Sequence, residues 1–340
     1  MLQFSDILGQ SSAINLLRRA YAADRLPHGL IFAGPVGVGK GTTARALAGV
    51  FLCEHPAGDS ACGRCASCRG MQAGNHPDYH VIFRELIRYH DKGGKSKGID
   101  LSINVIRPEL IEPANRKSAM GRGKVFIVEE AETMNAAAQN SMLKTLEEPA
   151  GRTIIILLTD QPESLLATIR SRCQMIRFAA LDRKLVTSEL GRRGIDPATA
   201  DEAAGWTEGS LGAAIKLIED GVAEPARELA GKIDALLVGR APGDLPDWLK
   251  KAAEAYADKQ LERDELASKD AATRTGLALY MKLAAQRLRA TLKREEDPDR
   301  LEQACAAIDA IALAEKYLDA NVNVSIALQN LSAQLGDALV

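Results

Sequence analysis

Ile31-Phe32-Ala33-Gly34-Pro35-Val36-Gly37-Val38-Gly39-Lys40 is the stretch that decides the fold of this 340-residue chain. It has the spacing G-x-x-x-x-G-K of a phosphate-binding loop, set between the apolar segment Gly29–Ala33 and a segment rich in Ala and Thr. In such a loop, backbone N–H groups cradle the phosphates and the lysine reaches them. The sequence therefore predicts a nucleotide-binding fold, with nucleotide-binding residues Gly34, Gly37, Gly39, Lys40, Gly41 and Thr42.

The position after the lysine departs from this motif. A Ser or Thr hydroxyl normally binds the Mg²⁺ that bridges the β and γ phosphates, but this chain has Gly41. Thr42 does not replace it, because one helical step turns a side chain by about 100°. The loop amides and Lys40 still permit binding of ATP or ADP. The Mg²⁺ site is degraded, so we expect hydrolysis to be weak or absent.

A second acidic motif of P-loop proteins follows a buried strand, and Val125–Val128 ends in Glu129 and Glu130. Asp normally holds the first of these positions and binds Mg²⁺ directly or through water. Glu129 is one methylene longer, so we interpret the pair as a degenerate acidic motif. The alternative is a buried strand followed by ordinary surface acids.

Four cysteines lie close together in the sequence. Cys53, Cys62, Cys65 and Cys68 are separated by eight, two and two residues. Four thiolates suit a structural Zn²⁺ site, because they fill a tetrahedral shell and leave no position for a catalytic water. The alternatives are a reduced, metal-free loop or a disulfide.

Apolar segments at Gly29–Ala33, Tyr79–Phe83, Lys124–Val128, Thr153–Thr159 and Met175–Phe178 alternate with helical patterns. This alternation predicts parallel βαβ units. After Leu181 the pattern is helical only. The basic, Gly-rich segment 84–98 predicts a mobile, solvated loop, with contact to DNA as the alternative.

Composition excludes several classes. The net charge of −2 gives no global attraction to DNA or to a membrane. The longest apolar run, Ile154–Leu158, is too short to span a bilayer. The first residues lack the pattern of a signal peptide, so we expect a cytoplasmic protein whose cysteines are thiols or metal ligands.

Taken together, several segments resemble the clamp-loader branch of the AAA+ ATPases, and in particular the clamp-loader subunits of bacterial DNA polymerase III. The resemblance covers about residues 1–215. It rests on Gly9-Gln10, Arg25-Leu26-Pro27-His28, Gly34–Lys40, the four cysteines, Glu129–Asn135, Asn140–Pro149 and Thr168-Ile169-Arg170-Ser171-Arg172-Cys173.

Departures from the pattern distinguish among the subunits. The motor subunits, gamma or tau, carry Ser or Thr where this chain has Gly41, usually Asp where it has Glu129, and a sensor arginine where it has Ala213. Ser171-Arg172-Cys173 is intact, however. In clamp loaders this arginine reaches the γ-phosphate held by the neighbouring subunit. The resemblance therefore implies the stator subunit, with Arg172 as an arginine finger in trans.

The resemblance also implies the architecture and the partners. We expect an AAA+ α/β P-loop domain over residues 1–178 with a zinc-binding insertion at 53–68, a helical lid over 179–221 and an all-helical collar over 222–340. The partners would be gamma or tau motors and a delta subunit in a hetero-pentameric ring. That ring would load the β sliding clamp onto primer–template DNA, as part of the DNA polymerase III holoenzyme.

Three alternatives remain. The chain could be an active gamma/tau-type motor with an unusual P-loop. It could be a zinc-dependent DNA-binding protein with a relic ATPase fold. It could also be a structural scaffold in which Arg172 only forms a salt bridge.

Overall fold

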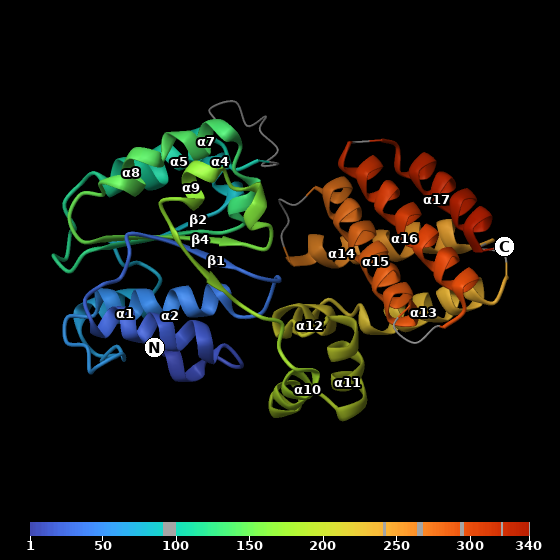
Figure 1. Ribbon diagram of the computed structural model, residues 1–340, viewed down its shortest axis with the longest axis horizontal. Helices are drawn as coiled ribbons and strands as arrows, with labels where there is room; N and C mark the ends of the chain where they lie inside the picture. Colours follow the sequence, from blue (N-terminus) through green and yellow to red (C-terminus); the bar gives the residue numbers. More distant parts are fainter. Residues whose placement is uncertain (91–99, 241–242, 264–267, 293–295, 321, 340) are drawn as a thin grey trace. The chain divides into compact units, whose positions relative to one another are not determined.

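The computed structural model describes residues 1–90, 100–240, 243–263, 268–292, 296–320 and 322–339 (Figure 1). The chain divides into two compact units. The N-terminal unit contains Met1–Val186 with Glu208–Ala213, and the C-terminal unit contains Thr187–Thr207 with Ala214–Val340. The three-domain division drawn from the sequence stays a prediction.

A five-stranded sheet with the order β2-β3-β4-β1-β5 forms the centre of the N-terminal unit, and all its pairings are parallel. The βαβ prediction is therefore confirmed, with strand ends that differ by at most one residue. The strands are β1 (Gly29–Ala33), β2 (Tyr79–Ile82), β3 (Lys124–Val128), β4 (Thr153–Thr159) and β5 (Gln174–Arg177).

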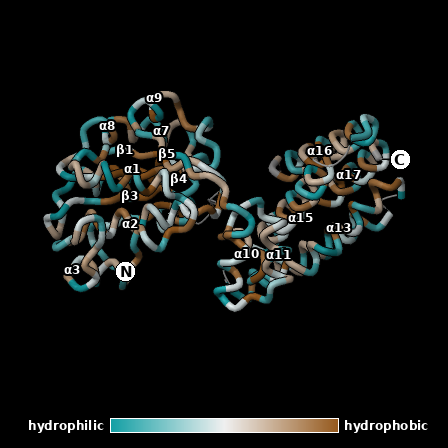
Figure 2. The backbone as a smooth tube through the Cα atoms, turned by 60° about the horizontal axis from the view of Figure 1, so that its bottom comes forward, coloured by the Kyte–Doolittle hydropathy of each residue, from teal (hydrophilic) through white to brown (hydrophobic). Residues whose placement is uncertain are grey.

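Helices cover both faces of the sheet (Figure 1). Leu30 and Phe32 of β1 pack in one apolar cluster with residues of α1 and α2. Ile31 and Ala33 pack in the opposite cluster with residues of α5, α7, α8 and α9. A parallel strand covered on both faces is mostly apolar, and β1, β3 and β4 are buried throughout. Figure 2 shows the largely hydrophobic character of these strands.

The helices of this unit are α1 (Ser11–Ala22), α2 (Lys40–Leu52), α3 (Ala66–Gln72), α4 (Ile87–His90), α5 (Ile103–Ile106), α6 (Glu112–Ala114), α7 (Ala136–Ser141), α8 (Leu143–Glu147) and α9 (Ala167–Arg170). The pattern at 135–148 predicts one helix, but the structure has two, because the α-helix breaks at Met142. A π-helical turn at Arg107–Ile111 follows α5 and contains Pro108.

The prediction of a loop at residues 84–98 is wrong for residues 84–90. Arg84–Leu86 forms a 3-10 turn and Ile87–His90 forms α4. Ile87 is buried in the apolar cluster that also contains α5, and His90 Nε2 lies 2.6 Å from Glu109 Oε1. These contacts order the segment despite its polar composition. Residues 91–98 of the expected loop lie outside the described residues.

The C-terminal unit is helical, as the sequence predicts. Its long helices α13–α17 pack into a bundle in which Trp248 and Tyr280 make an edge-to-face contact, with ring centroids 5.6 Å apart. Arg287 on α15 binds Asp234 on α13 through Nε (2.8 Å) and Nη2 (2.6 Å). The helices after the sheet are α10 (Arg183–Arg192), α11 (Pro197–Trp206), α12 (Leu211–Glu219), α13 (Ala223–Leu237), α14 (Leu245–Arg263), α15 (Lys269–Leu292), α16 (Pro298–Asp319) and α17 (Val324–Leu339).

Within the described ranges, no helix combines the length and the apolar character needed to cross a bilayer.

A buried lysine closes the amino end of β3. Lys124 is 3% exposed, and its Nζ donates to the backbone carbonyls of Pro113 (3.2 Å), Ala114 and Arg116. These carbonyls lie at the end of the short helix α6, where a helix leaves its last C=O groups without intrahelical partners, although the Pro113 carbonyl also accepts the Arg116 N–H (3.1 Å). Burial lowers the pKa of Lys124. The ammonium group therefore acts as an internal cap for this helix end.

We expect Lys124→Met to destabilise the N-terminal unit by about 1–3 kcal/mol, because it leaves the buried carbonyl of Ala114 without its donor. The midpoint of urea unfolding measures this. Lys117→Met is the matched control, since Lys117 is exposed and should tolerate the change. Equal midpoints for the two variants would contradict the capping role.

Candidate functional site

The phosphate-binding loop runs from the carboxyl end of β1 to the first residue of α2. Gly37 and Gly39 have φ values of 75° and 104°, which side chains rarely adopt. Gly39 is the N-cap of α2, so the free N–H groups of the first helical turn lie at the loop. The loop thus has backbone N–H groups arranged as in an anion site, and its binding of a nucleotide stays a prediction.

The segment Glu208–Ala213 packs directly on this loop. Ser210 Oγ donates to the Val36 carbonyl (2.7 Å), and the Gly212 N–H donates to the Gly37 carbonyl (2.9 Å). A Cβ on Gly37 would lie only 2.3 Å from Ser210 Oγ. Gln10 adds a third brace through Nε2, which donates to the Val38 carbonyl at 3.1 Å. The loop is therefore held by residues far from it in the sequence.

Lys40 folds back on its own loop. Its Nζ donates to the carbonyls of Gly34 and Pro35, the latter at 2.7 Å, and the residue is 9% exposed. Burial lowers the pKa of Lys40, while the nearby carboxylates of Asp160 and Glu132 act in the opposite direction. To bind a phosphate, the ammonium group would have to break its hydrogen bonds to these carbonyls.

In the first turn of α2, Thr43 is the residue whose hydroxyl points at the loop. Gly41 supplies none, and Thr42 is exposed. Thr43 is buried, and its Oγ1 donates to the Gly39 carbonyl at 2.8 Å. A Cβ on Gly41 would meet only Leu158 Cδ1, at 3.7 Å. There is therefore space for a side chain at position 41, where the motif normally has its Mg²⁺ ligand.

The two acids of the degenerate motif pair with arginines. Glu129 Oε1 lies 3.7 Å from Arg45 Nη2, and Glu130 Oε2 lies 3.2 Å from Arg84 Nε. Both carboxylates are thus engaged with exposed cations. Their assignment to a nucleotide site stays a prediction.

The carboxylates that act on Lys40 are instead those of Glu132 and Asp160. Burial raises the pKa of Glu132, and Asp160 adds to the rise. Both residues follow adjacent strands, β3 and β4, at the carboxyl edge where α/β sheets bind ligands. Neither residue belongs to the motifs predicted from the sequence to bind nucleotide or Mg²⁺. Their position just after two predicted strands was the available signal.

Arg172 lies at the opposite end of β1 from the phosphate loop. A Cβ on Gly29, the first residue of β1, would lie 3.2 Å from the Arg172 carbonyl oxygen and 2.7 Å from Cys173 Sγ. Burial raises the pKa of Cys173 to about 12, so its thiol is a neutral packing group. β1 has five residues and rises about 3.3 Å per residue, so about 15 Å separate the two ends.

The Arg172 guanidinium is bound at the surface. Its Nε donates to Glu147 Oε1 at 2.5 Å, Nη2 pairs with the same oxygen, and Nη1 donates to the Thr168 carbonyl at 3.0 Å. The Arg172 side chain is 33% exposed. Glu147 could not be recognised from the sequence as the ion-pair partner of Arg172, because 25 residues separate Glu147 from Arg172 in the chain.

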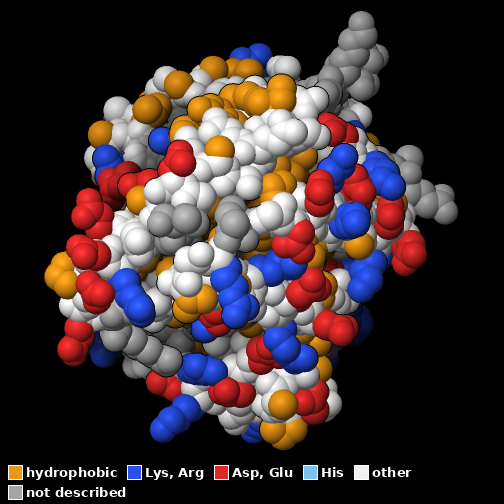
Figure 3. Space-filling view, turned by 90° about the vertical axis from the view of Figure 1, so that its right-hand side faces the viewer, with side chains coloured by type: hydrophobic (Ala, Val, Ile, Leu, Met, Phe, Trp, Pro, Cys, Tyr) orange, Lys and Arg blue, Asp and Glu red, His pale blue; other side chains and the backbone are white. Residues whose placement is uncertain are grey.

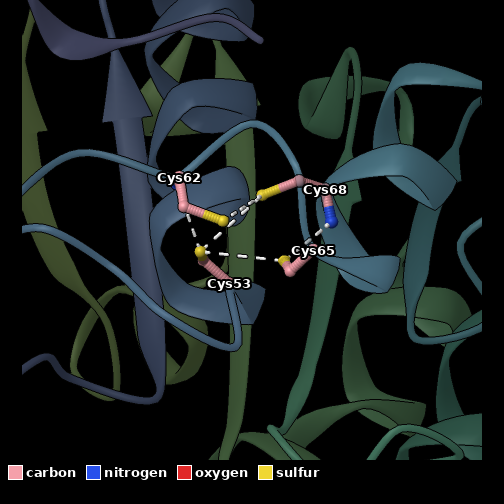
Figure 4. A group of neighbouring side chains, drawn as sticks. All are labelled: Cys53, Cys62, Cys65 and Cys68. Atoms are coloured by element: carbon pink, nitrogen blue, oxygen red, sulfur yellow. Dashed lines mark hydrogen bonds between the residues drawn. The ribbon is translucent and has the colours of Figure 1, made fainter.

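The four cysteines converge on one point (Figure 4). All four sulfurs lie within 4.8 Å of one another, with distances of 4.0 Å for Cys53–Cys65, 3.9 Å for Cys62–Cys68 and 3.6 Å for Cys53–Cys68. A tetrahedral site with Zn–S bonds of about 2.3 Å requires S···S distances of about 3.8 Å. Three of the sulfur pairs are thus close to this spacing, and the cluster could hold a metal ion.

Backbone groups and burial act on these thiols in opposite directions. N–H groups of Arg64 and Cys65 lower the pKa of Cys62 to about 6, whereas burial raises the pKa of Cys53 and Cys68. A metal cation favours the thiolate form of all four.

A buried histidine supports the loop that carries the last two cysteines. His76 Nδ1 accepts the Asp78 N–H (3.1 Å), so Nε2 carries the proton and donates to Ser67 Oγ (2.9 Å). Ser67 Oγ in turn donates to the Leu52 carbonyl (2.8 Å). The cysteine loop is thereby fastened to the end of α2.

Comparison with known proteins gives the family. Residues 9–182 match the family described as "DNA polymerase III, delta subunit". The chain belongs to this family. Together with the parallel sheet and the phosphate loop, this membership establishes the AAA+ α/β class expected from the sequence.

Individual relatives agree with this family. The chain is 38% identical to DNA polymerase III subunit delta' of Escherichia coli over 173 residues, which cover 51% of this chain and 48% of that protein. It is 27% identical to subunit tau of Bacillus subtilis over 265 residues, covering 76% of this chain and 44% of tau. The chain thus matches about half the length of these relatives.

A solved structure from Thermotoga maritima, described as a DNA polymerase III gamma subunit-related protein, aligns with 96% of this chain and 99% of its own. The identity is 20% and the TM-score is 0.43.

We expect the purified chain to bind about one Zn²⁺, and Cys62→Ser to lower the metal content strongly, because it removes one of four thiolates. Cys305→Ser is the control, since Cys305 is exposed and lies outside the cluster. Metal content and limited proteolysis of residues 53–68 measure the effect.

Chelation should loosen this loop without unfolding the sheet, which has its own apolar core. Global unfolding on chelation, or an unchanged loop in metal-free protein, would contradict this expectation.

Proposed function

We propose that this chain is the stator, or delta-prime, subunit of a DNA polymerase III clamp loader. In this proposal it assembles in the cytoplasm with gamma or tau motor subunits and a delta subunit in a hetero-pentameric ring. The ring opens the β sliding clamp and places it on primer–template DNA. This chain contributes Arg172 to the ATP site of the neighbouring motor and provides a rigid face for that motor.

The position of Arg172 carries the proposal. The residue lies at the amino edge of the sheet, whereas the chain's own phosphate loop lies at the carboxyl edge. With about 15 Å of β1 between the two edges, the guanidinium is out of reach of a nucleotide in the same chain. An arginine that acts on a γ-phosphate from this position must act on that of another subunit.

The chain's own nucleotide site supports a role without turnover. Lys40 donates to loop carbonyls, Gly41 offers no metal ligand, and Glu129 and Glu130 pair with Arg45 and Arg84. Binding of ATP or ADP through the loop amides is compatible with this geometry. Efficient Mg²⁺-assisted hydrolysis is not, because the metal lacks its usual protein ligands.

The metal in the cysteine cluster is proposed to be a structural Zn²⁺. Four sulfur ligands at tetrahedral spacing leave no open coordination position for a water or a substrate. Cys53, Cys62, Cys65 and Cys68 would hold the ion and order the loop between α2 and α3.

One alternative has a specific observation in its favour. The ion pair of Arg172 with Glu147 is what a purely structural scaffold would contain. The relic DNA-binding alternative has less support, since acidic and basic side chains are interspersed on the face drawn in Figure 3 and the net charge is −2.

The isolated chain should hydrolyse ATP at background rate. Gly41→Thr should fold normally, because its Cβ would meet only Leu158 at an ordinary contact distance. It should not restore turnover, because Glu129 and Glu130 remain paired with Arg45 and Arg84. Steady-state phosphate release measures both. A clear activity that Lys40→Ala abolishes would support the motor alternative instead.

Arg172→Ala should leave ring assembly intact and disable the one motor site beside this subunit, because arginine fingers contribute roughly 10³–10⁵ in rate. Arg172→Lys should rescue poorly, since an ammonium group lacks the planar fork. The assay is clamp loading and DNA-stimulated ATPase of the ring reconstituted with motors, delta, clamp and primed DNA. Normal loading by Arg172→Ala would leave the scaffold alternative.

A further inference from the structure

The ion pair between Glu147 and Arg172 lies at the surface, and the backbone gives the guanidinium a further contact. Both the Nε and the Nη2 groups of Arg172 contact a single carboxylate oxygen, Glu147 Oε1, the first at 2.5 Å. Nη1 donates to the Thr168 carbonyl at 3.0 Å. The guanidinium is therefore fixed from two directions, by a side chain on α8 and by the backbone of α9.

Both supports belong to elements that are themselves anchored. Glu147 ends α8, next to Leu146, which is buried in the apolar cluster against the sheet. Thr168 lies in α9, next to the buried Ile169. On the other side of Arg172, Cys173 packs against the start of β1. The contacts to Arg172 thus come from rigid parts of the unit.

The contacts leave part of the guanidinium free. Arginine has five N–H donors. Nε and one N–H of Nη2 serve Glu147, and one N–H of Nη1 serves Thr168. Each Nη nitrogen therefore retains one further N–H, and that of Nη1 has only a long contact of 3.5 Å with Ser171 Oγ. Donors remain for phosphate oxygens while Glu147 stays bound.

We propose that Glu147 is a positioning residue that holds the Arg172 guanidinium in the orientation in which its remaining N–H groups can bind a phosphate presented by another subunit. This inference rests on the proposed function. An arginine side chain that is not held loses much rotamer entropy on binding, and Glu147 removes most of that loss in advance. Glu147 acts through Arg172 and does not touch the nucleotide.

The test is a double-mutant cycle in the reconstituted ring, with the variants Glu147→Ala, Arg172→Ala and both together. Glu147→Ala should slow clamp loading at saturating ATP by about 10- to 100-fold, the effect expected of a misplaced catalytic group, and should leave the KM for ATP nearly unchanged. In the double variant, the loss should equal that of Arg172→Ala alone, because a residue that acts only through Arg172 has no effect without it.

Conservative variants and controls separate positioning from a general structural role. Glu147→Gln keeps an oxygen that can accept both N–H groups, so it should retain most of the loading rate. Glu148→Ala removes the adjacent exposed acid, and Glu163→Ala removes the partner of Arg170, which ends α9. Both controls should load at the normal rate, and all variants should assemble into rings with unchanged melting temperatures.

Three results would overturn the inference. They are an unchanged or faster loading rate for Glu147→Ala, losses that multiply in the double variant, and an equal loss in either control. A faster rate would mean that Glu147 competes with the phosphate for Arg172. Failure of the proposed function is distinguishable from these, because in that case Arg172→Ala itself would load normally.

Discussion

The structure depends on one constraint, the burial of β1 on both faces and its pairing with β4 and β5 on both edges. A strand held in this way cannot bend or slide, so the separation between its two ends is fixed. The phosphate loop leaves from one end, and Arg172 packs at the other. The fold thus keeps Lys40 and Arg172 apart within a single chain, so in the proposed function the two could act together only across an interface between subunits.

The cationic side chains at the two ends of β1 are both hydrogen-bonded within the chain. Lys40 is held by carbonyls of its own loop, whereas Arg172 is held by Glu147 and the Thr168 carbonyl. The difference lies in what remains available. Lys40 is almost fully buried, while the Arg172 side chain is one-third exposed and keeps unused N–H groups. This asymmetry agrees with a subunit that contributes to a neighbour's site more than to its own.

Local patterns predicted most of the fold and part of the site. The strands were recognisable because burial on both faces requires continuous apolar runs, as in Ile154–Leu158, and the cysteine cluster because its spacing is typical of metal ligands. The partners of charged side chains were not predictable. Glu129 pairs with Arg45, and Arg172 with Glu147, across distances in sequence that only the folded chain closes. Ile87 is likewise buried, in the apolar cluster that also contains residues of α5, within a segment whose composition indicated a loop.

The strand order has a consequence for how the chain is made. β1 pairs only with β4 and β5, and more than a hundred residues separate Ala33 from Thr153. At synthesis rates of about 5–20 residues per second, β1 waits roughly ten seconds on the ribosome for its first partner. During that time an uncharged, strand-forming segment has both edges unpaired, which favours aggregation. All four cysteines, by contrast, lie within a short segment that emerges early, so their loop can close around a metal ion before the sheet exists.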